Sequence, residues 1–137
     1  MSITVRPCLA SEADDVLALW ADSGAEPTST DDVDSVARLM SHDAQALIVA
    51  DDDGQLVGSV IAVWDGWRGS VYRLVVAPSH RRQGLACRLL KEAELRLRAQ
   101  GAARLAAIVV EDDPQATGFW RKSGWEEQIL RIRFVSG

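Results

Sequence analysis

The stretch Val76-Ala-Pro-Ser-His-Arg-Arg-Gln-Gly-Leu-Ala86 decides the fold, because it joins a strand to a helix through a turn suited to an anion. An apolar run ends at Pro78, Arg81 and Arg82 follow, and Gly84 opens a strongly amphipathic segment. The first N–H groups of a helix lack intrahelical partners and carry a partial positive charge, which suits phosphate. Glycine lets the backbone approach an anion closely, and arginines add charge-assisted hydrogen bonds. The stretch therefore predicts a phosphate-bearing ligand at this helix start; a tight turn with two solvated arginines is the alternative.

Other phosphate-binding motifs are absent from the sequence. It contains neither Gly-x-x-x-x-Gly-Lys-Ser/Thr nor Gly-x-Gly-x-x-Gly. These patterns are typical of nucleoside triphosphatases and of dinucleotide-binding folds, so both classes lack support.

The segments on either side of the turn have clear periodicities. Residues 84–100 carry apolar side chains at helical spacing, and Gly101 is a natural helix end. Upstream, Ser11 and Thr30 are positioned to cap two helices that follow a short first strand. The remaining expected elements are strands at 3–7, 46–50, 55–64, 71–76, 105–110 and 128–135, and a short helix at 114–123.

The predicted order is β-α-α-β-β-β-α-β-α-β, in which three strands connected by hairpins precede the first β-α-β crossover. This order favours an α+β fold with a mixed, mostly antiparallel sheet flanked by helices, and it argues against a doubly wound parallel sheet. The chain has 137 residues, 47% of them apolar, without a repeat or linker that would split it. We therefore expect one domain over residues 1–137.

Charge is distributed unevenly along the chain. Residues 1–53 contain twelve acidic residues and two arginines, a net charge of −10, while residues 54–137 contain eight acidic and thirteen basic residues, a net charge of +5. The basic part suits an anionic ligand and the acidic part a cationic one, although both surfaces can simply be solvated. The acidic first part argues against a nucleic-acid partner.

The N-terminus and the cysteines indicate a cytoplasmic protein. No apolar run approaches the roughly 20 residues that span a bilayer, and the first residues lack the pattern of a signal peptide. We therefore expect no membrane partner. Cys8 and Cys87 stand alone, which favours two reduced thiols over a disulfide or a metal site.

Two motifs at a fixed separation resemble a known family. Arg81-Arg-Gln-Gly-Leu-Ala86 matches the Arg/Gln-x-x-Gly-x-Gly/Ala signature of the GNAT (GCN5-related N-acetyltransferase) family, and Leu74-x-Val76-x-Pro78 matches the strand that precedes it. Phe119-Trp-Arg-Lys-Ser-Gly-Trp125 resembles the later Phe-Tyr-x-x-x-Gly-Phe segment of that family. The turn Asp65–Ser70 is similar to that of the small bacterial YpeA-like branch. The element order also agrees, so the resemblance covers nearly the whole chain.

The resemblance implies acetyl-CoA as a cosubstrate and requires no metal. In this family the pantetheine arm lies between two splayed strands, here 72–76 and 105–110, and the pyrophosphate lies on the backbone of the signature turn. The segment from Asp113 to Trp120 flanks the thiol end. The implied cofactor-binding residues are Leu74, Val75, Val76, Arg81, Arg82, Gln83, Gly84, Leu85, Ala86, Asp113, Ala116 and Trp120.

The resemblance also implies the reaction. A neutral amine would attack the thioester carbonyl directly, and a backbone N–H of the strand 74–76 would hold the oxyanion. An acid would protonate the CoA thiolate, and a base or a water chain would take the amine proton. The implied product is an N-acetylated small molecule or peptide, and the acidic first helices suggest a cationic acceptor. A homodimer is compatible with the sequence.

The general acid is the point at which the sequence departs from the family. Trp120 stands where many relatives have tyrosine, and an indole is not a useful proton donor at neutral pH. Tyr72 is one substitute, because period-two alternation places it on the strand face of Val76 and Leu74. Glu111 is a candidate base; packing and loop solvation are the alternatives for these two. The departure motivates a second hypothesis, a non-catalytic acyl-CoA-binding sensor or structural module.

Overall fold

The computed structural model describes residues 2–109 and 114–137. The chain forms two compact units, Met1–Ala107 and Ile108–Gly137, each of which is described by itself. Glu111 and Asp113 lie outside the described residues.

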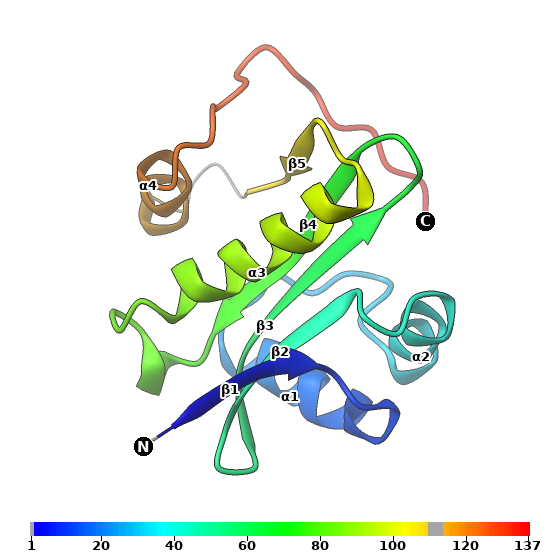
Figure 1. Cartoon of the computed structure of the whole chain (residues 1–137), viewed down its shortest axis with the longest axis vertical. Coiled ribbons are helices and arrows are strands. Elements are labelled where there is room, and N and C mark those ends of the chain that lie inside the picture. Colours follow the sequence, from blue (N-terminus) through cyan, green and yellow to red (C-terminus); the bar gives the residue numbers. More distant parts are fainter. Residues whose placement is uncertain (1, 110–113) are drawn as a thin grey trace. The chain divides into compact units, whose positions relative to one another are not determined.

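The first unit is built on a five-stranded mixed sheet (Figure 1). Its strands lie side by side in chain order: β1 (Ile3–Pro7), β2 (Leu47–Asp52), β3 (Gln55–Trp64), β4 (Gly69–Val76) and β5 (Leu105–Ala107). The first three neighbouring pairs are antiparallel, and β4 with β5 is parallel. The mixed, mostly antiparallel sheet predicted from the element order is confirmed.

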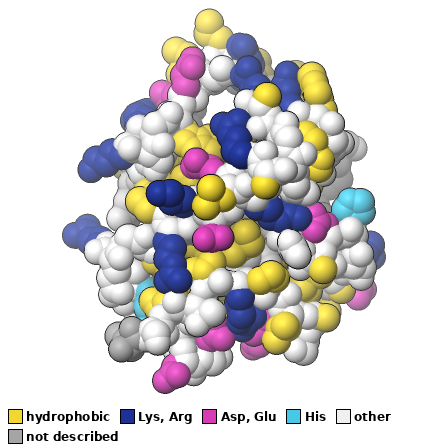
Figure 2. All heavy atoms as spheres, viewed as in Figure 1, with side chains coloured by type: hydrophobic (Ala, Val, Ile, Leu, Met, Phe, Trp, Pro, Cys, Tyr) yellow, Lys and Arg dark blue, Asp and Glu magenta, His cyan; other side chains and the backbone are white. Residues whose placement is uncertain are grey.

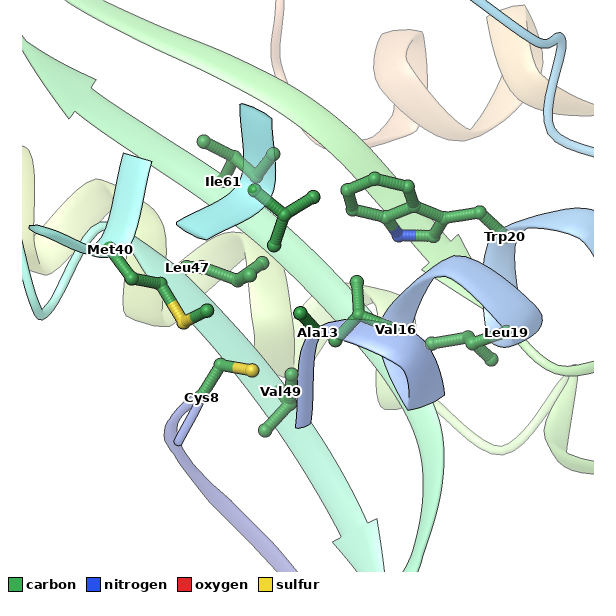
Figure 3. Close-up of a cluster of buried hydrophobic side chains, with 10 residues drawn as sticks. Cys8, Ala13, Val16, Leu19, Trp20, Met40, Leu47, Val49 and Ile61 are labelled. Carbon is green, nitrogen blue, oxygen red and sulfur yellow. The ribbon is translucent and has the colours of Figure 1, made fainter. Parts of the chain in front are cut away.

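Helices cover both faces of this sheet (Figure 1). α1 (Ala13–Asp22) and α2 (Val33–His42) cover one face, and α3 (Leu85–Gln100) runs along β3 and β4 on the other. The apolar core under α1 and α2 joins side chains of both helices to β2 and β3 (Figure 3). It comprises Cys8, Ala13, Val16, Leu19, Trp20, Val36, Met40, Leu47, Val49 and Ile61.

The starts of α1 and α2 differ from the predicted caps. A 3₁₀ turn (Ala10–Glu12) leads into α1, and there the N–H of Leu9 donates to Glu12 Oε1 at 2.9 Å, so Ser11 is not the cap. Asp32, not Thr30, caps α2 by accepting a backbone N–H at 2.7 Å. Several polar residues precede each helix, and tertiary packing selects among them.

β4 contains a β-bulge in its pairing with β3. Ser59 pairs with Val75, whereas Ile61, two residues later on β3, pairs with Tyr72, three residues earlier on β4. β4 therefore holds one extra residue at this place. Arg73 adopts a positive φ of 50°, a left-handed conformation that costs a residue with a Cβ about 1–2 kcal/mol.

The bulge changes which residues of β4 share a face, because cross-strand partners point to the same side. Ile61 belongs to the core under α1 and α2, so its partner Tyr72 points to that face. A Cβ at Gly58 would meet Leu89 of α3, so its partner Val76 points to the α3 face. The prediction that Tyr72 shares the face of Val76 is wrong, because the extra residue reverses the alternation.

The second unit contains α4 (Pro114–Lys122), close to the predicted helix at 114–123. The predicted strand at 128–135 is wrong: residues 126–137 form neither helix nor strand. Alternation describes only side chains, and a strand also needs a neighbour for its backbone groups. Large apolar side chains of this segment are 72–89% exposed, namely Ile129, Leu130, Ile132, Phe134 and Val135.

The strand predicted at 105–110 is also shorter than expected. It spans Leu105–Ala107, residues 108 and 109 have no regular structure, and Val110 is not described. Within residues 2–109 and 114–137, none of the helices is long and apolar enough to cross a membrane.

Candidate functional site

The turn between β4 and α3 has the backbone geometry of an anion site. A 3₁₀ turn (Pro78–His80) follows β4, and Gly84 then precedes α3 with a φ of +79°. This left-handed value favours glycine, because a Cβ would be strained there. No side chain caps the start of α3. The first N–H groups of α3 therefore lack a side-chain acceptor and remain suited to a ligand oxygen.

The space around Gly84 is open. A Cβ added there would meet no heavy atom of the described residues within 4 Å, and Gln83 beside it is exposed. Leu85, in contrast, is buried and anchors the first turn of α3 in the core. These observations fit a pyrophosphate site. The buried Leu85 fixes the first turn of α3, and the backbone N–H groups of that turn are accessible to a ligand.

The two arginines of the turn have different surroundings. Arg81 donates from Nε to the carbonyl of Val76 at 3.1 Å and from Nη2 to the carbonyl of Ser23 at 2.8 Å. It therefore ties the turn to the ends of β4 and α1. Arg82 is exposed, and its side chain has no hydrogen-bond or ion-pair partner among the described residues. Of the two, Arg82 has the freer guanidinium for an anion.

His80 connects the turn to the end of β2. Its Nε2 lies 2.7 Å from Oδ2 of Asp52, at the end of β2, and its Nδ1 lies 2.7 Å from Oγ of Ser79. The turn is thus fastened to β2, β4 and α1 before any ligand binds, which is the preorganisation that a binding loop needs.

The end of β4 has an open edge in the first unit. β4 pairs with β5 only at Gly69, Ser70 and Val71, because β5 ends at Ala107. Within the first unit, the remaining part of β4, from Tyr72 to Val76, has no ladder partner on the β5 side. Backbone groups without a protein partner need another one, which a ligand can supply. This edge leads directly into the turn, so the predicted residues 74–76 and 81–86 are contiguous.

Tyr72 is 47% exposed and points to the face of α1 and α2, as its pairing with Ile61 shows.

Sequence reasoning missed the residues that hold the strand beside Tyr72. Ser59 is completely buried and accepts a hydrogen bond from Trp20 Nε1 at 2.8 Å. It donates to the carbonyl of Arg73 at 2.8 Å. An isolated serine in an apolar strand was the only signal for this arrangement.

The predicted residues of the second unit lie in α4. Trp120 makes edge-to-face contacts with Phe119, at 5.8 Å between ring centroids, and with Trp125, at 4.7 Å. Ala116 lies one turn earlier in the same helix. Trp120 is thus a member of an aromatic cluster, which gives an indole at this position a packing role.

The exposed face of α3 carries several basic side chains. Figure 2, viewed with α3 towards the reader, shows Lys and Arg side chains spread over this part of the molecule. Arg88, Lys91, Arg96 and Arg98 all belong to α3. Among the described residues, no group of three or more His, Cys, Asp or Glu side chains is arranged to hold a metal ion.

Comparisons with known proteins give a consistent result. Residues 13–125 match the model of the Acetyltransferase (GNAT) family. The chain is 33% identical to Acetyltransferase YE1169 of Yersinia enterocolitica over 124 residues, which cover 90% of this chain and 88% of that protein.

Solved structures with a similar fold include Ard1 from Thermoplasma volcanium, at 18% identity and a TM-score of 0.80, covering 90% of this chain and 82% of that chain. A second is aminoglycoside N-acetyltransferase AAC(6')-Iy in complex with CoA, at 17% identity and a TM-score of 0.75, covering 98% and 95% of the two chains. At these identities the two structures support the fold alone.

Proposed function

Because the chain belongs to the acetyltransferase (GNAT) family and is therefore an acyltransferase, we propose that it transfers the acetyl group of acetyl-CoA to a primary amine. The acceptor is a small molecule or a peptide. The observation that carries the proposal is the left-handed Gly84 at the start of α3, next to the open edge of β4. Since the family match runs from residue 13 to residue 125, across both units, we propose one functional domain.

The donor side of the proposal uses backbone groups. The N–H groups from Arg82 to Ala86 bind the pyrophosphate, and the Arg82 side chain adds a charge-assisted bond. The open edge at Leu74, Val75 and Val76 pairs with the amides of the pantetheine arm. Gln83 and Leu85 contribute through their backbone. The roles of Asp113, Ala116 and Trp120 rest on the family resemblance.

The chemistry needs a polarised carbonyl and two proton transfers. A backbone N–H of β4 stabilises the oxyanion that forms when the amine attacks the thioester. A thiol such as that of cysteine has a pKa of about 8.5, so a thiolate is a good leaving group and its protonation does not require a strong acid. This lessens the significance of a tryptophan at position 120. Tyr72, which is exposed, and Glu111, which lies outside the described residues, remain the candidates for acid and base.

The acceptor side is proposed to favour a cationic amine. α1, α2 and their connection carry many acidic residues, including the exposed Asp22 and Glu26. Release of free CoA, measured with a thiol reagent over a panel of amines, tests the substrate class. Turnover confined to neutral or acidic acceptors would rule out this preference, and CoA binding without release from any amine would support the sensor hypothesis instead.

The donor site is tested by Gly84→Glu. A carboxylate and a Cβ in the left-handed position are expected to weaken CoA binding by at least about tenfold, because a negative charge replaces open space at the phosphate site. Isothermal titration with CoA measures the change. Arg82→Glu should act in the same direction.

Gly66→Glu is the matched control. Gly66 has a φ of +92° and equally open surroundings, but its turn precedes β4, while Gly84 follows it. The two variants carry the same backbone strain and the same charge. Equal CoA affinities in both variants and the parent would show that the pyrophosphate does not bind at the start of α3.

A further inference from the structure

Arg73, the bulge residue of β4, is held by contacts from three parts of the first unit. Its carbonyl accepts the Ser59 hydroxyl, and its Nη2 donates to Asp31 Oδ2 at 2.5 Å and to the carbonyl of Glu26 at 2.8 Å. Its guanidinium carbon lies 5.2 Å from the centre of the Trp20 ring. A residue in a left-handed conformation persists only where its surroundings enforce it, and these contacts do so.

The backbone of the bulge is fixed through the core. Trp20 Nε1 donates to Ser59 Oγ, which in turn donates to the Arg73 carbonyl, both at 2.8 Å. Ser59 is the one buried polar side chain in the part of the chain that the structure describes. Burying a hydroxyl group costs free energy unless the group is hydrogen-bonded. The two hydrogen bonds of Ser59 satisfy its hydroxyl and fix the position of the Arg73 carbonyl.

The side chain of Arg73 connects β4 to the segment between α1 and α2. Arg73 and Asp31 are 15% and 19% exposed, so their ion pair is shielded from solvent more than an ordinary surface pair. Glu26 and Asp31 belong to the connection between α1 and α2, which is part of the proposed acidic acceptor side. The geometry of the bulge is thus coupled to the loop on which the acceptor is proposed to bind.

We propose that Arg73 is a positioning residue, which acts with Asp31 and the Ser59–Trp20 pair to hold the bulge of β4. The bulge reorients the backbone N–H groups of residues 73–75, so that one of them points at the thioester carbonyl. This inference rests on the proposed acetyl transfer. It adds that the orientation of the N–H donor is set by Arg73 together with Asp31 of the α1–α2 connection and the Ser59–Trp20 pair of the core.

The test uses an acetyl-CoA analogue in which a methylene group replaces the thioester sulfur, so that a ketone carbonyl, labelled with ¹³C, stands at the thioester position. The carbonyl resonance of this bound ketone reports hydrogen bonding to the oxygen without any acceptor or turnover. The variants are Asp31→Asn, which keeps the shape and removes the charge, and Arg73→Met, which removes the donors. Glu92→Gln is the control, because Glu92 is exposed on α3, away from the proposed acceptor side, and has no partner among the described residues.

We expect Asp31→Asn and Arg73→Met to bind the ketone within about twofold of the parent, with the carbonyl resonance shifted towards its free value. With acetyl-CoA and an accepted amine, kcat should fall on the order of 10- to 100-fold and the KM for acetyl-CoA should change little. Arg73→Lys, which keeps a charge near Asp31, should recover part of the loss. Glu92→Gln should match the parent.

An unchanged carbonyl resonance in both variants would overturn the inference, because the N–H donor would then be oriented without Arg73. If Arg73→Met does not fold, Asp31→Asn alone decides, since it is the milder change. Failure of the parent to bind the ketone is a different outcome, which refutes the proposed function and with it this inference.

Discussion

At the scale of single residues, the two cysteines have opposite environments. Cys8 is 6% exposed, and burial raises the pKa of its thiol to about 11. Cys87 is exposed in the first turn of α3. Because the thiolate is the reactive form, burial and a raised pKa both protect Cys8 at neutral pH.

We therefore predict that iodoacetamide at pH 7.5 labels Cys87 in the folded protein and reaches Cys8 only after unfolding. CoA should slow the labelling of Cys87, because the proposed pyrophosphate site lies on the same helix turn. Mass spectrometry of the modified protein measures both rates, and Cys87→Ser should remove the native-state label. Labelling of Cys8 at a comparable rate would contradict the burial seen here.

At the scale of elements, α3 approaches the sheet closely because two glycines lie beneath it. A Cβ at Gly58 would lie 2.9 Å from Cδ1 of Leu89 and 3.3 Å from the carbonyl oxygen of Val75. A Cβ at Gly69 would meet Cδ1 of Leu97 at 2.9 Å. The position of α3, and with it the anion-binding turn at its start, therefore depends on the absence of side chains at these two places.

Gly58→Ala is expected to destabilise the protein by about 1–3 kcal/mol, because the added methyl would overlap the side chain of Leu89. Chemical denaturation measures the loss. In a Leu89→Ala background the same change should cost less, since the truncated side chain leaves room, and the difference is the coupling between the two sites. Equal costs in both backgrounds would mean that α3 does not pack on Gly58.

Much of the arrangement of helices and strands can be predicted from sequence periodicity. The three-strand meander, the amphipathic α3 and the turn at Gly84 were predicted because each is encoded by neighbouring residues. The caps at Glu12 and Asp32 were assigned to other polar residues, because several candidates are adjacent. The bulge at Arg73 could not be predicted, since its partners Asp31 and Ser59 are distant in sequence.

The candidate site likewise has a part that the sequence predicts and a part that it does not. The residues of the signature turn are adjacent in sequence, and the structure brings them together with the end of β4. Arg81 was expected to serve the anion, and the structure shows that it also bonds two carbonyls of the fold, those of Val76 and Ser23. The strand expected at 128–135 failed because its alternation specifies a face but not a partner strand.

At the scale of the whole molecule, acid stability is linked to carboxylates bonded in the folded state. The hydrogen bond from Arg6 holds the pKa of Glu12 below its ordinary value, and backbone N–H groups lower the pKa of Asp32 and Asp65. A carboxylate with a lowered folded-state pKa stabilises the fold above its unfolded-state pKa, about 4.3 for Glu. That stabilisation is lost as the pH falls through the folded-state value.

We predict that the melting temperature is nearly constant from pH 7 to about pH 5 and falls below that. Glu12→Gln should lower the melting temperature at pH 7 and make the acid dependence shallower. Differential scanning calorimetry across this range measures both effects. An acid profile unchanged by Glu12→Gln would show that the bonds from Arg6 to Glu12 do not contribute to it.

The extra residue in β4 also affects how this strand must be aligned with related sequences. Removing one residue between Tyr72 and Val75 would restore simple pairing with β3 and leave Tyr72 opposite Ile61 and Val75 opposite Ser59, each on its present face. A related strand that lacks the extra residue therefore needs an alignment gap at the bulge. Without that gap, the alignment would equate positions that face α1 and α2 with positions that face α3. A change of length at the Asp65–Arg68 turn, in contrast, requires no gap within the strand.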